Sequence, residues 1–306
     1  MSKASEFIRT TVAAGDEARD AGLTTPEDIQ RFDDILYGTD AEWQMLDVYR
    51  PKAAEGQVLP VIVSVHGGGW VYGDKERYQY YCMNLAERGF AVVNFTYRLA
   101  PEFTFPSSME DTNLVFTWVL EHREEYGFDT EHVFAVGDSA GAHLLGLYSC
   151  ACTNPDYASG FPFRFPEGFA PCAIGLNCGV YRVTLDEATD ELTREVMKDF
   201  LPEKGTPEEL AQICVLDHIT PQFPPTFLMT ATGDFLQEQA PPLQATLLRN
   251  QVPFTFRFYG SAAEEPLGHV FHCNIRLEAS KCCNDEECAF FGKYLTQEKE
   301  EAADEA

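Results

Sequence analysis

The sequence predicts an α/β fold with a mostly parallel central sheet that is flanked by helices. Short apolar runs alternate with longer amphipathic stretches, which indicates strands that are separated along the chain by helices. Residues 61–63 and 91–93 are continuously apolar, as is typical of parallel strands that are buried on both faces. Two glycine-containing motifs directly follow such runs, at the strand ends where open α/β sheets hold their ligands.

The elements are assigned in order from apolar runs and amphipathic spacing. Strands are predicted at residues 44–49, 58–66, 90–97, 133–136, 172–178, 226–231 and 254–259. Helices are predicted at residues 75–88, 109–126, 142–152, 190–201, 239–250 and 285–297. A further helix is expected to start at Thr206-Pro207, because threonine is a favoured cap and proline a favoured first residue.

Residues 1–40 and 180–222 do not fit this alternation. The first segment is polar and helical in character, and the second contains the helices expected between the fifth and sixth strands. We expect both segments to form a small helical cap over a pocket, within a single domain that spans residues 1–306. For residues 180–222, the alternative is a crossover without substrate contact. The aromatic run 160–166 is expected to form an ordered loop near the pocket mouth and to help shape the pocket.

Composition argues against several classes of protein. The 306 residues are 45% hydrophobic and 13% aromatic, which indicates a globular chain with enough residues for one α/β domain. A net charge of −27 argues against binding to nucleic acid or to anionic membrane surfaces. No stretch approaches the roughly 20 apolar residues of a membrane span. The first residues are polar and include an acid, unlike a signal peptide, so a cytoplasmic location is expected.

The 10 cysteines are expected to be reduced thiols, because many lie in apolar runs where cysteine acts as a small hydrophobic residue. One group raises the question of a zinc site: Cys273, Cys282, Cys283 and Cys288. Structural zinc sites prefer two closely spaced cysteine pairs, which this group lacks, so no metal site is expected.

Residues 137–141 read Gly-Asp-Ser-Ala-Gly and lie between the apolar run 133–136 and a helical stretch. A strand, a sharp turn with a serine at its tip and then a helix form the context of a nucleophile elbow, with Ser139 as the nucleophile. Glycines are needed on both sides of the serine because the turn is strained and crowded. The alternative is an ordinary serine that caps the helix after a strand.

A second motif, His66-Gly67-Gly68-Gly69-Trp70, follows a strand that is rich in β-branched residues. Acyl transfer places negative charge on a carbonyl oxygen, and fixed N–H groups must be aimed at that oxygen. A glycine run lets the backbone come close enough to offer its amides, and the residue after the nucleophile adds another. A phosphate-binding loop is the alternative, but such a loop ends in Lys followed by Ser or Thr, which this motif lacks.

A serine nucleophile needs a histidine to accept its proton and an acid to orient that histidine. After a nucleophile elbow, the acid and then the histidine follow in the chain. Asp234 comes just after the strand at 226–231 and is preferred as the acid over Asp217, which lies in a polar linker. His269 is preferred as the base because it lies in a loop, whereas His272 is expected to enter the last helix as a surface or capping residue.

Together these segments resemble the hormone-sensitive-lipase family of α/β-hydrolase fold serine esterases, over roughly residues 40–295. The segments are His66–Trp70, Tyr97-Arg98-Leu99-Ala100-Pro101-Glu102 and Gly137–Gly141. The resemblance implies a serine carboxylesterase that acts on short, acetyl-type acyl esters. It implies a triad and an oxyanion hole at these positions: Ser139, Asp234 and His269, with the amides of Gly68, Gly69 and Ala140. Gly67 is the alternative to either loop glycine.

The resemblance also sets expectations for the surroundings of the site. Arg98 and Glu102 are expected to tie loops together beneath it by ion pairs. One departure is that the family often has His-Gly-Phe around the base, whereas this chain has valine between His269 and Phe271. Trp70 and Tyr72 are expected to bind substrate.

The implied reaction needs no cofactor, and its partner is a small-molecule ester bound by a monomer or homodimer. Two alternatives of other classes stay open. One is a non-catalytic small-molecule-binding protein on the same fold. The other is an acyltransferase or peptidase that uses the same triad.

Overall fold

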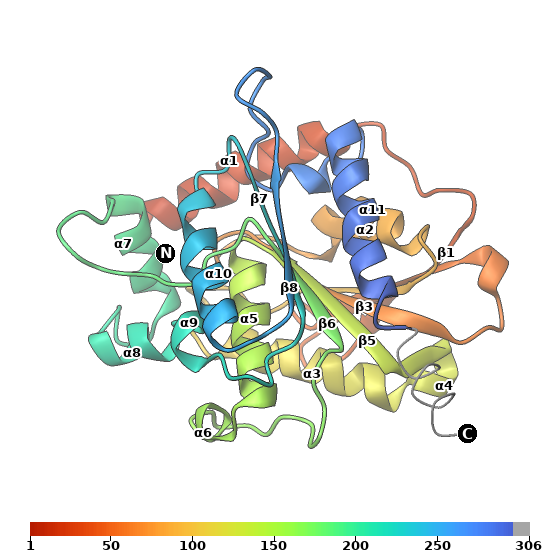
Figure 1. Ribbon diagram of the computed structural model, residues 1–306, viewed down its shortest axis with the longest axis horizontal. Helices are drawn as coiled ribbons and strands as arrows, with labels where there is room; N and C mark the ends of the chain where they lie inside the picture. The colour runs from red at the N-terminus through yellow and green to blue at the C-terminus, as the bar shows by residue number, and fades with distance from the viewer. Residues whose placement is uncertain (296–306) are drawn as a thin grey trace.

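The computed structural model describes residues 1–295, and its eight-stranded sheet confirms the predicted fold class. The strands are β1 (Ile29–Leu36), β2 (Met45–Pro51), β3 (Leu59–Val65), β4 (Ala91–Phe95), β5 (Phe128–Asp138), β6 (Ala173–Asn177), β7 (Thr226–Ala231) and β8 (Phe254–Tyr259). Their order in the sheet is β1-β2-β4-β3-β5-β6-β7-β8 (Figure 1). Neighbours from β4 to β8 pair in parallel, whereas β1 and β2 join antiparallel at one edge.

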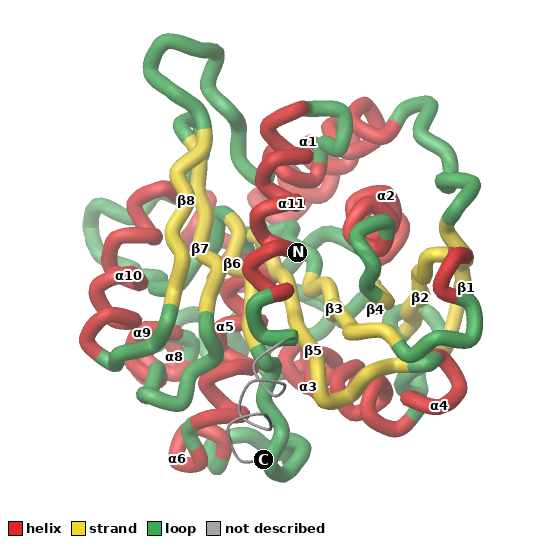
Figure 2. The backbone as a smooth tube through the Cα atoms, turned by 45° about the vertical axis from the view of Figure 1, so that its right-hand side comes forward, coloured by secondary structure: helices red, strands yellow, loops and turns green. Residues whose placement is uncertain are grey.

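Helices cover both faces of the sheet, because parallel strands need crossover connections. The longer helices are α1 (Lys3–Asp20), α2 (Lys75–Ala86), α3 (Ser107–Glu121), α5 (Ala140–Thr153), α7 (Glu191–Phe200), α10 (Ala240–Arg249) and α11 (Glu278–Gly292). The shorter ones are α4 (Arg123–Tyr126), α6 (Pro155–Ala158), α8 (Pro207–Gln212) and α9 (Val215–His218), with 3-10 turns η1 (Lys52–Ala54), η2 (Gln237–Gln239) and η3 (Phe271–Cys273). Helices α2 and α11 pack on one face, and α3, α5 and α10 pack on the other (Figure 2). Within residues 1–295, no helix has both the length and the apolar composition to cross a bilayer.

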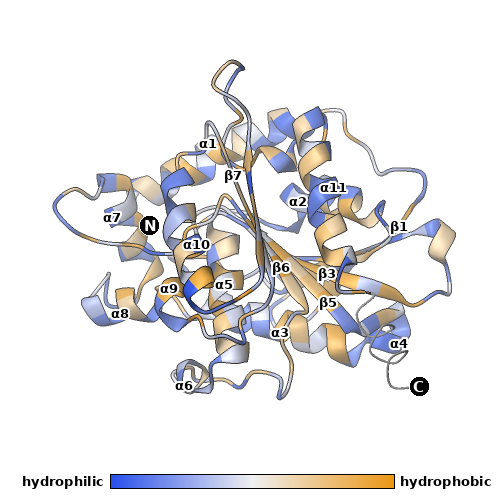
Figure 3. Ribbon diagram, in the orientation of Figure 1, coloured by the Kyte–Doolittle hydropathy of each residue, from blue (hydrophilic) through white to orange (hydrophobic). Residues whose placement is uncertain are grey.

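The middle of the sheet is buried from both sides, which accounts for the consecutive apolar residues on its strands (Figure 3). On β3, Val61 and Val63 pack with the helices of one face, and Ile62 packs with those of the other. All three side chains are completely buried. Two helical layers therefore hold the strands whose carboxyl ends carry the glycine loop and the serine turn.

The structure differs from the predicted elements in several places, among them β5, which begins at Phe128 and not at residue 133. Residues 29–36, expected to be polar and helical, form the edge strand β1, where only one face needs apolar residues. The helix predicted at 109–126 ends at Glu121, and the short helix α4 follows, with Gly127 in the left-handed conformation at its end. The last helix begins at Glu278, ahead of the predicted start at 285, and residues 296–297 of that prediction lie outside the described residues.

The two helices predicted in the 180–222 segment begin close to the predicted residues, and each has a capping residue at its start. Asp190 caps α7, and Thr206 forms a capping box with Glu209 at the start of α8. Helix α1 is tied to α7 by the Ser5 hydroxyl, which donates to Asp199 at 2.6 Å. In Figure 1 the N-terminus accordingly lies beside α7.

Arg98 and Glu102 both form ion pairs, as expected from the sequence, but their partners lie on helices and not in loops. Arg98 lies 2.8 Å from Asp111 on α3. Glu102 lies 2.6 Å from Arg9 on α1. The segment after β4 is therefore anchored on one side to α3 and on the other to the N-terminal helix.

Candidate active site

A cavity of about 610 Å³ lies at the carboxyl ends of the parallel strands, where α/β sheets hold their ligands. The glycine loop after β3 and the serine turn after β5 contribute to its lining, and side chains from α1 and α7 contribute as well. The predicted site residues that line it are Gly68, Gly69, Trp70, Tyr72, Ser139, Ala140 and His269. Asp234 is buried and bonded to His269. Residues far apart in the sequence thus meet in one pocket.

Ser139 occupies the turn between β5 and α5 with φ 51° and ψ −117°, a backbone conformation that is unusual for a residue with a side chain. Its amide donates to the carbonyl oxygen of Asn177 at 3.0 Å, which holds the turn against β6. A Cβ on Gly137 would lie 2.6 Å from the carbonyl oxygen of Gly141, and a Cβ on Gly141 would collide with the carbonyl of Val65. The turn therefore has the crowding that requires both glycines.

His269 Nδ1 lies 2.7 Å from Asp234 Oδ1. Asp234 also accepts hydrogen bonds from the Thr230 hydroxyl at 2.6 Å and from the Leu236 amide at 2.9 Å. Burial acts to raise the pKa of Asp234, but these hydrogen bonds outweigh it and hold the pKa below its ordinary value. An ionised carboxylate at this distance favours the tautomer with its proton on Nδ1, which leaves Nε2 of His269 able to accept a proton. Within the described residues, the Ser139 side chain makes no hydrogen bond, either to the helix that follows it or to His269, whose side chain bonds to Asp234.

The two rejected alternatives lie elsewhere. His272 is completely buried in η3 against Tyr81, so the expectation of a surface or helix-capping residue is wrong. Burial lowers the pKa of His272 to about 3, because the charged imidazole is poorly solvated there. Asp217 lies on α9 and pairs with Arg182 at 3.3 Å. Neither His272 nor Asp217 lines the pocket.

Val270 has φ 51° and ψ 33°, a left-handed conformation that β-branched residues rarely adopt. Glycine takes this conformation without strain, which accounts for the glycine of the family pattern at this position. This chain keeps valine there, and His269 still reaches Asp234.

Gly68 and Gly69 have φ values of 112° and 60°, which glycine adopts readily. No hydrogen bond among the described residues uses their amides, so both N–H groups are free to meet a ligand. Ala140 is the first residue of α5, and the first amides of a helix have no partner within it. Gly67 differs, because its amide donates to the Tyr78 hydroxyl at 2.9 Å.

Tyr78 joins the glycine loop to the serine turn. Its hydroxyl donates to Asp138 Oδ2 at 2.7 Å while it accepts from Gly67. Burial raises the pKa of Asp138 to about 6, partly opposed by the hydrogen bond from Tyr78. Asp138 belongs to the Gly-Asp-Ser-Ala-Gly motif. Nothing in the sequence around Tyr78 indicates that its hydroxyl bonds to that motif.

Trp70 and Tyr72 line the pocket with their polar atoms already bonded. Trp70 is only 6% exposed, stacks on Phe200 with ring centroids 4.8 Å apart, and donates to His143 at 3.2 Å. The Tyr72 hydroxyl donates to Asp16 at 2.9 Å. The Trp70 ring is therefore largely covered by protein, whereas Tyr72 is only partly buried and offers ring surface to a ligand.

The aromatic run 160–166 does not shape the pocket, contrary to expectation. Phe161 packs on Phe105 and Tyr157, with ring centroids 6.0 and 5.2 Å away, and Phe165 packs near Tyr148. The residues that line the cavity within the described chain include none of this run. Packing of these rings against Phe105 and against side chains of α5 and α6 explains the composition of the run.

The polar first segment and the 180–222 segment both contribute pocket residues that the sequence did not single out. From α1 and from the region around α7 these are Ile8, Val12, Asp16, Arg19, Val180, Arg182, Val183, Leu192, Val196 and Met197. Their helical spacing indicates only an apolar face, so no local signal distinguishes a pocket wall from core packing.

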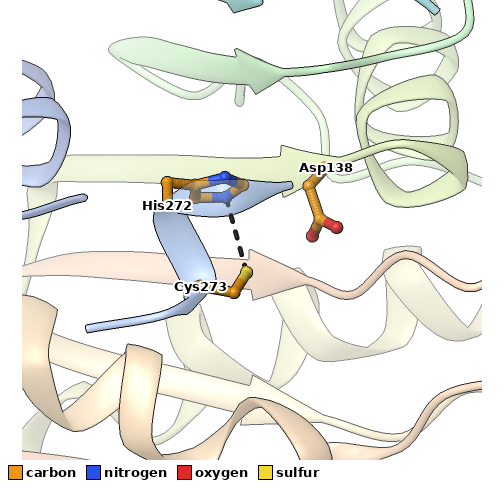
Figure 4. A group of neighbouring side chains, drawn as sticks. All are labelled: Asp138, His272 and Cys273. Carbon is orange, nitrogen blue, oxygen red and sulfur yellow. Dashed lines mark hydrogen bonds between the residues drawn. The ribbon is translucent and has the colours of Figure 1, made fainter. Parts of the chain in front are cut away.

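Two groups of side chains bring metal-ligand atoms within 4.8 Å of one another. In the first, Asp138 at the end of β5 faces His272 and Cys273 of η3 (Figure 4). Burial raises the pKa of the Cys273 thiol well above its ordinary value, which disfavours the thiolate that a metal would need. The second group contains the acid–histidine pair: Cys178, Asp234 and His269.

A parallel sheet with a serine turn after β5 and an acid–histidine pair in the loops after β7 and β8 makes this chain an α/β-hydrolase. Within that class, the BD-FAE family model matches residues 46–252, and the chain belongs to that family. The relatives and structural neighbours are esterases of this fold, which confirms the resemblance to the hormone-sensitive-lipase group.

Individual relatives are about a quarter identical to this chain over the aligned residues. Esterase LipQ of Mycobacterium tuberculosis is 28% identical over 206 residues, which cover 66% of this chain and 48% of LipQ. An acetyl esterase of Salmonella schwarzengrund is 26% identical over 217 residues, which cover 69% of this chain and 66% of that protein. The chain thus spans about half the length of LipQ and of its mycobacterial relative LipC. A crystal structure of inhibited esterase B from Lactobacillus rhamnosis has a TM-score of 0.86 and 27% identity, and the match covers 96% of both chains.

Proposed function

We propose that the chain is a carboxylic ester hydrolase that cleaves short-chain, acetyl-type esters through an acyl-enzyme on Ser139. The observation that carries the proposal is the 2.7 Å pair of His269 and Asp234 beside the pocket that Ser139 also lines. The names of the relatives, among them an acetyl esterase, support the reaction class and the acyl group.

In the first half of the reaction, the Ser139 hydroxyl oxygen attacks the ester carbonyl carbon. Nε2 of His269 takes the hydroxyl proton, and Asp234 stabilises the imidazolium that forms. The carbonyl oxygen becomes negative and accepts hydrogen bonds from amides of the oxyanion hole, for which we assign Gly68, Gly69 and Ala140. One such donor contributes about 3–4 kcal/mol to transition-state stabilisation.

In the second half, the imidazolium of His269 gives its proton to the leaving alcohol oxygen as the C–O bond breaks. A water molecule then attacks the acyl carbon of Ser139 while His269 accepts a proton from it. The acid product leaves, and the proton returns to the Ser139 oxygen. This sequence requires no cofactor.

The proposal makes α1 and the 180–222 segment a cap over the pocket of a single domain. Their side chains on the pocket wall support this assignment. Tyr72 would contact the substrate through its ring and Trp70 through the small part of its ring that is exposed, because their polar atoms are bonded to protein groups.

The test is hydrolysis of p-nitrophenyl acetate by Ser139→Ala, with Ser159→Ala as the matched control. Ser159 is exposed just after α6 and lies outside the pocket lining. We expect Ser139→Ala to lose activity by roughly 10⁴–10⁶-fold and the control to stay unchanged. A fluorophosphonate probe should label Ser139 in the unmodified protein. Full activity in Ser139→Ala, with an unaltered circular dichroism spectrum, would contradict the proposal.

A further inference from the structure

Phe235 is a large apolar side chain that lies on the pocket and is left open to solvent. It directly follows Asp234, and 75% of its surface is exposed. Its ring centroid lies 4.2 Å from that of His269, with the ring planes at 42°. An aromatic ring exposed to this extent contributes little to the core, so its surface is available to a ligand.

The position of Phe235 is determined by the acid before it. Asp234 Oδ1 accepts the amide of Leu236, and the Gln237 amide donates to the carbonyl oxygen of Asp234 at 3.2 Å. These bonds hold the turn that carries Phe235 against the imidazole of His269. Val12 on α1 and Leu192 on α7 are also exposed apolar residues on the wall of the same pocket.

The reaction geometry indicates which part of an ester would meet Phe235. His269 must deliver a proton to the oxygen of the leaving alcohol, so that oxygen lies next to the imidazole. The group attached to the oxygen therefore extends on the imidazole side of the pocket, where Phe235 lies.

The charges on the pocket wall disfavour an anionic ligand. Arg19 is paired with Asp16 at 2.8 Å, and it also pairs with Asp20, while Arg182 is paired with Asp217. Two carboxylates on the wall, Asp186 and Asp190, form no ion pair among the described residues. With a net charge of −27 on the whole chain, an anion would be repelled from the pocket mouth.

We propose that Phe235 is a specificity-determining residue for the leaving group, and that the substrates are esters with an uncharged, apolar alcohol portion. This inference rests on the proposed function, because it assigns the alcohol side from the role of His269. Phe235 forms an apolar platform beside the imidazole, and an aromatic or bulky alkyl group covers it on binding.

The experiment compares kcat/KM for 2-phenylethyl acetate and ethyl acetate, which share the acyl group and release alcohols of similar acidity. Added apolar contacts change kcat/KM by roughly 10–200-fold in closed pockets, so we expect a preference of about tenfold for the phenylethyl ester on this half-open platform. Phe235→Ala should remove most of the preference, because its kcat/KM falls more for the phenylethyl ester than for ethyl acetate. Phe235→Leu should restore part of it.

Phe258→Ala is the matched control, because Phe258 is an exposed phenylalanine on β8 outside the pocket lining. It should keep the preference. A third ester, 4-(2-acetoxyethyl)benzoate, adds one carboxylate to the phenylethyl group and should be cleaved about tenfold more slowly than its neutral parent. Equal cleavage of these two esters would overturn the exclusion of anionic groups.

The outcomes separate this inference from the proposed function. If the unmodified protein cleaves ethyl acetate and is labelled at Ser139 but has no alcohol preference, the role of Phe235 is wrong and the esterase assignment stands. An equal loss on both esters in Phe235→Ala would likewise overturn it, because Phe235 would then act only through His269. If neither ester is cleaved and Ser139 is not labelled, the proposed function itself fails.

Discussion

The hydroxyl of Tyr78 bridges Gly67 and Asp138, and so connects the glycine loop to the serine turn. It accepts the Gly67 amide at 2.9 Å and donates to the Asp138 carboxylate at 2.7 Å. Tyr78 lies on α2, which packs on the face of the sheet away from α5. One buried phenol on a separate helix thereby helps to position the amides of Gly68 and Gly69 relative to Ser139.

Tyr78→Phe removes this bridge and leaves the ring in place. We expect kcat to fall by about tenfold with little change in KM, because a displaced oxyanion loop weakens transition-state binding more than substrate binding. Steady-state kinetics with p-nitrophenyl acetate measures the effect. Tyr80→Phe on the same helix removes a hydroxyl that bonds to the carbonyl of Leu23, and should keep normal kinetics. An unchanged kcat in Tyr78→Phe would show that the loop holds its position without the bridge.

Asp234→Asn keeps the size of the acid side chain but removes its charge. We expect kcat to fall by roughly 10³–10⁴-fold, because the amide favours the wrong imidazole tautomer and leaves the imidazolium without its counter-charge. The loss is measured with the same ester, and thermal unfolding reports whether the variant is folded. Asp217→Asn is the control at the competing acid, and it should be fully active. Loss of activity in Asp217→Asn but not in Asp234→Asn would show that Asp217 is the acid.

Glu287 provides a test of stability against pH. It is completely buried on α11, where it accepts a hydrogen bond from Asn177 at 2.9 Å, and burial raises its pKa from 4.5 to about 7. The folded protein therefore holds this proton at pH values where the unfolded chain has lost it. The proton on Glu287 therefore stabilises the folded protein. This stabilisation is fully present below pH 4.5 and is lost as the pH rises through about 7.

Glu287→Gln mimics the protonated form at every pH. Between about pH 5 and pH 8, we expect its free energy of unfolding to rise relative to that of the unmodified protein by up to about 3 kcal/mol. Urea unfolding at both pH values measures the difference. Glu286→Gln is the neighbouring control, because the pKa of Glu286 is below its ordinary value and its charge does not change over this range. If Glu287→Gln and the unmodified protein differ in free energy of unfolding by the same amount at both pH values, Glu287 is ionised in the folded protein.

Ser5→Ala removes the hydroxyl that ties α1 to Asp199 on α7. Because α1 contributes Ile8 and Val12 to the pocket wall, we expect KM to rise by a few fold while kcat changes little. The free energy of unfolding should fall by about 1.5–3 kcal/mol, the usual range for a hydrogen bond to a charged group. Thr10→Ala on the same helix removes a hydroxyl bonded only within α1, and should keep the normal KM. Equal KM values in the two variants would argue against a role of the tether in substrate binding.

Most of the sheet could be predicted because its signals are local. Strands β7 and β8 have the predicted bounds, since each is an apolar or alternating run between turn residues. Strand β1 could not be predicted in the same way, because an edge strand buries one face only and the four polar residues among 29–36 interrupt any apolar run. The burial of His272 also escaped prediction, since a polar residue in a short loop carries no mark of the helices that enclose it.

The sequence by itself determined the fold class and the location of the serine and glycine motifs, because turn chemistry and strand periodicity depend on neighbouring residues. Only the tertiary structure decided that His269 meets Asp234 while His272 is enclosed, and that the Gly67 amide is taken by Tyr78. It also decided that Phe235 lies open beside the imidazole. In each of these pairs, the two residues belong to segments that come together only when the helices pack on the sheet. No local pattern of residues determines how far apart such residues lie.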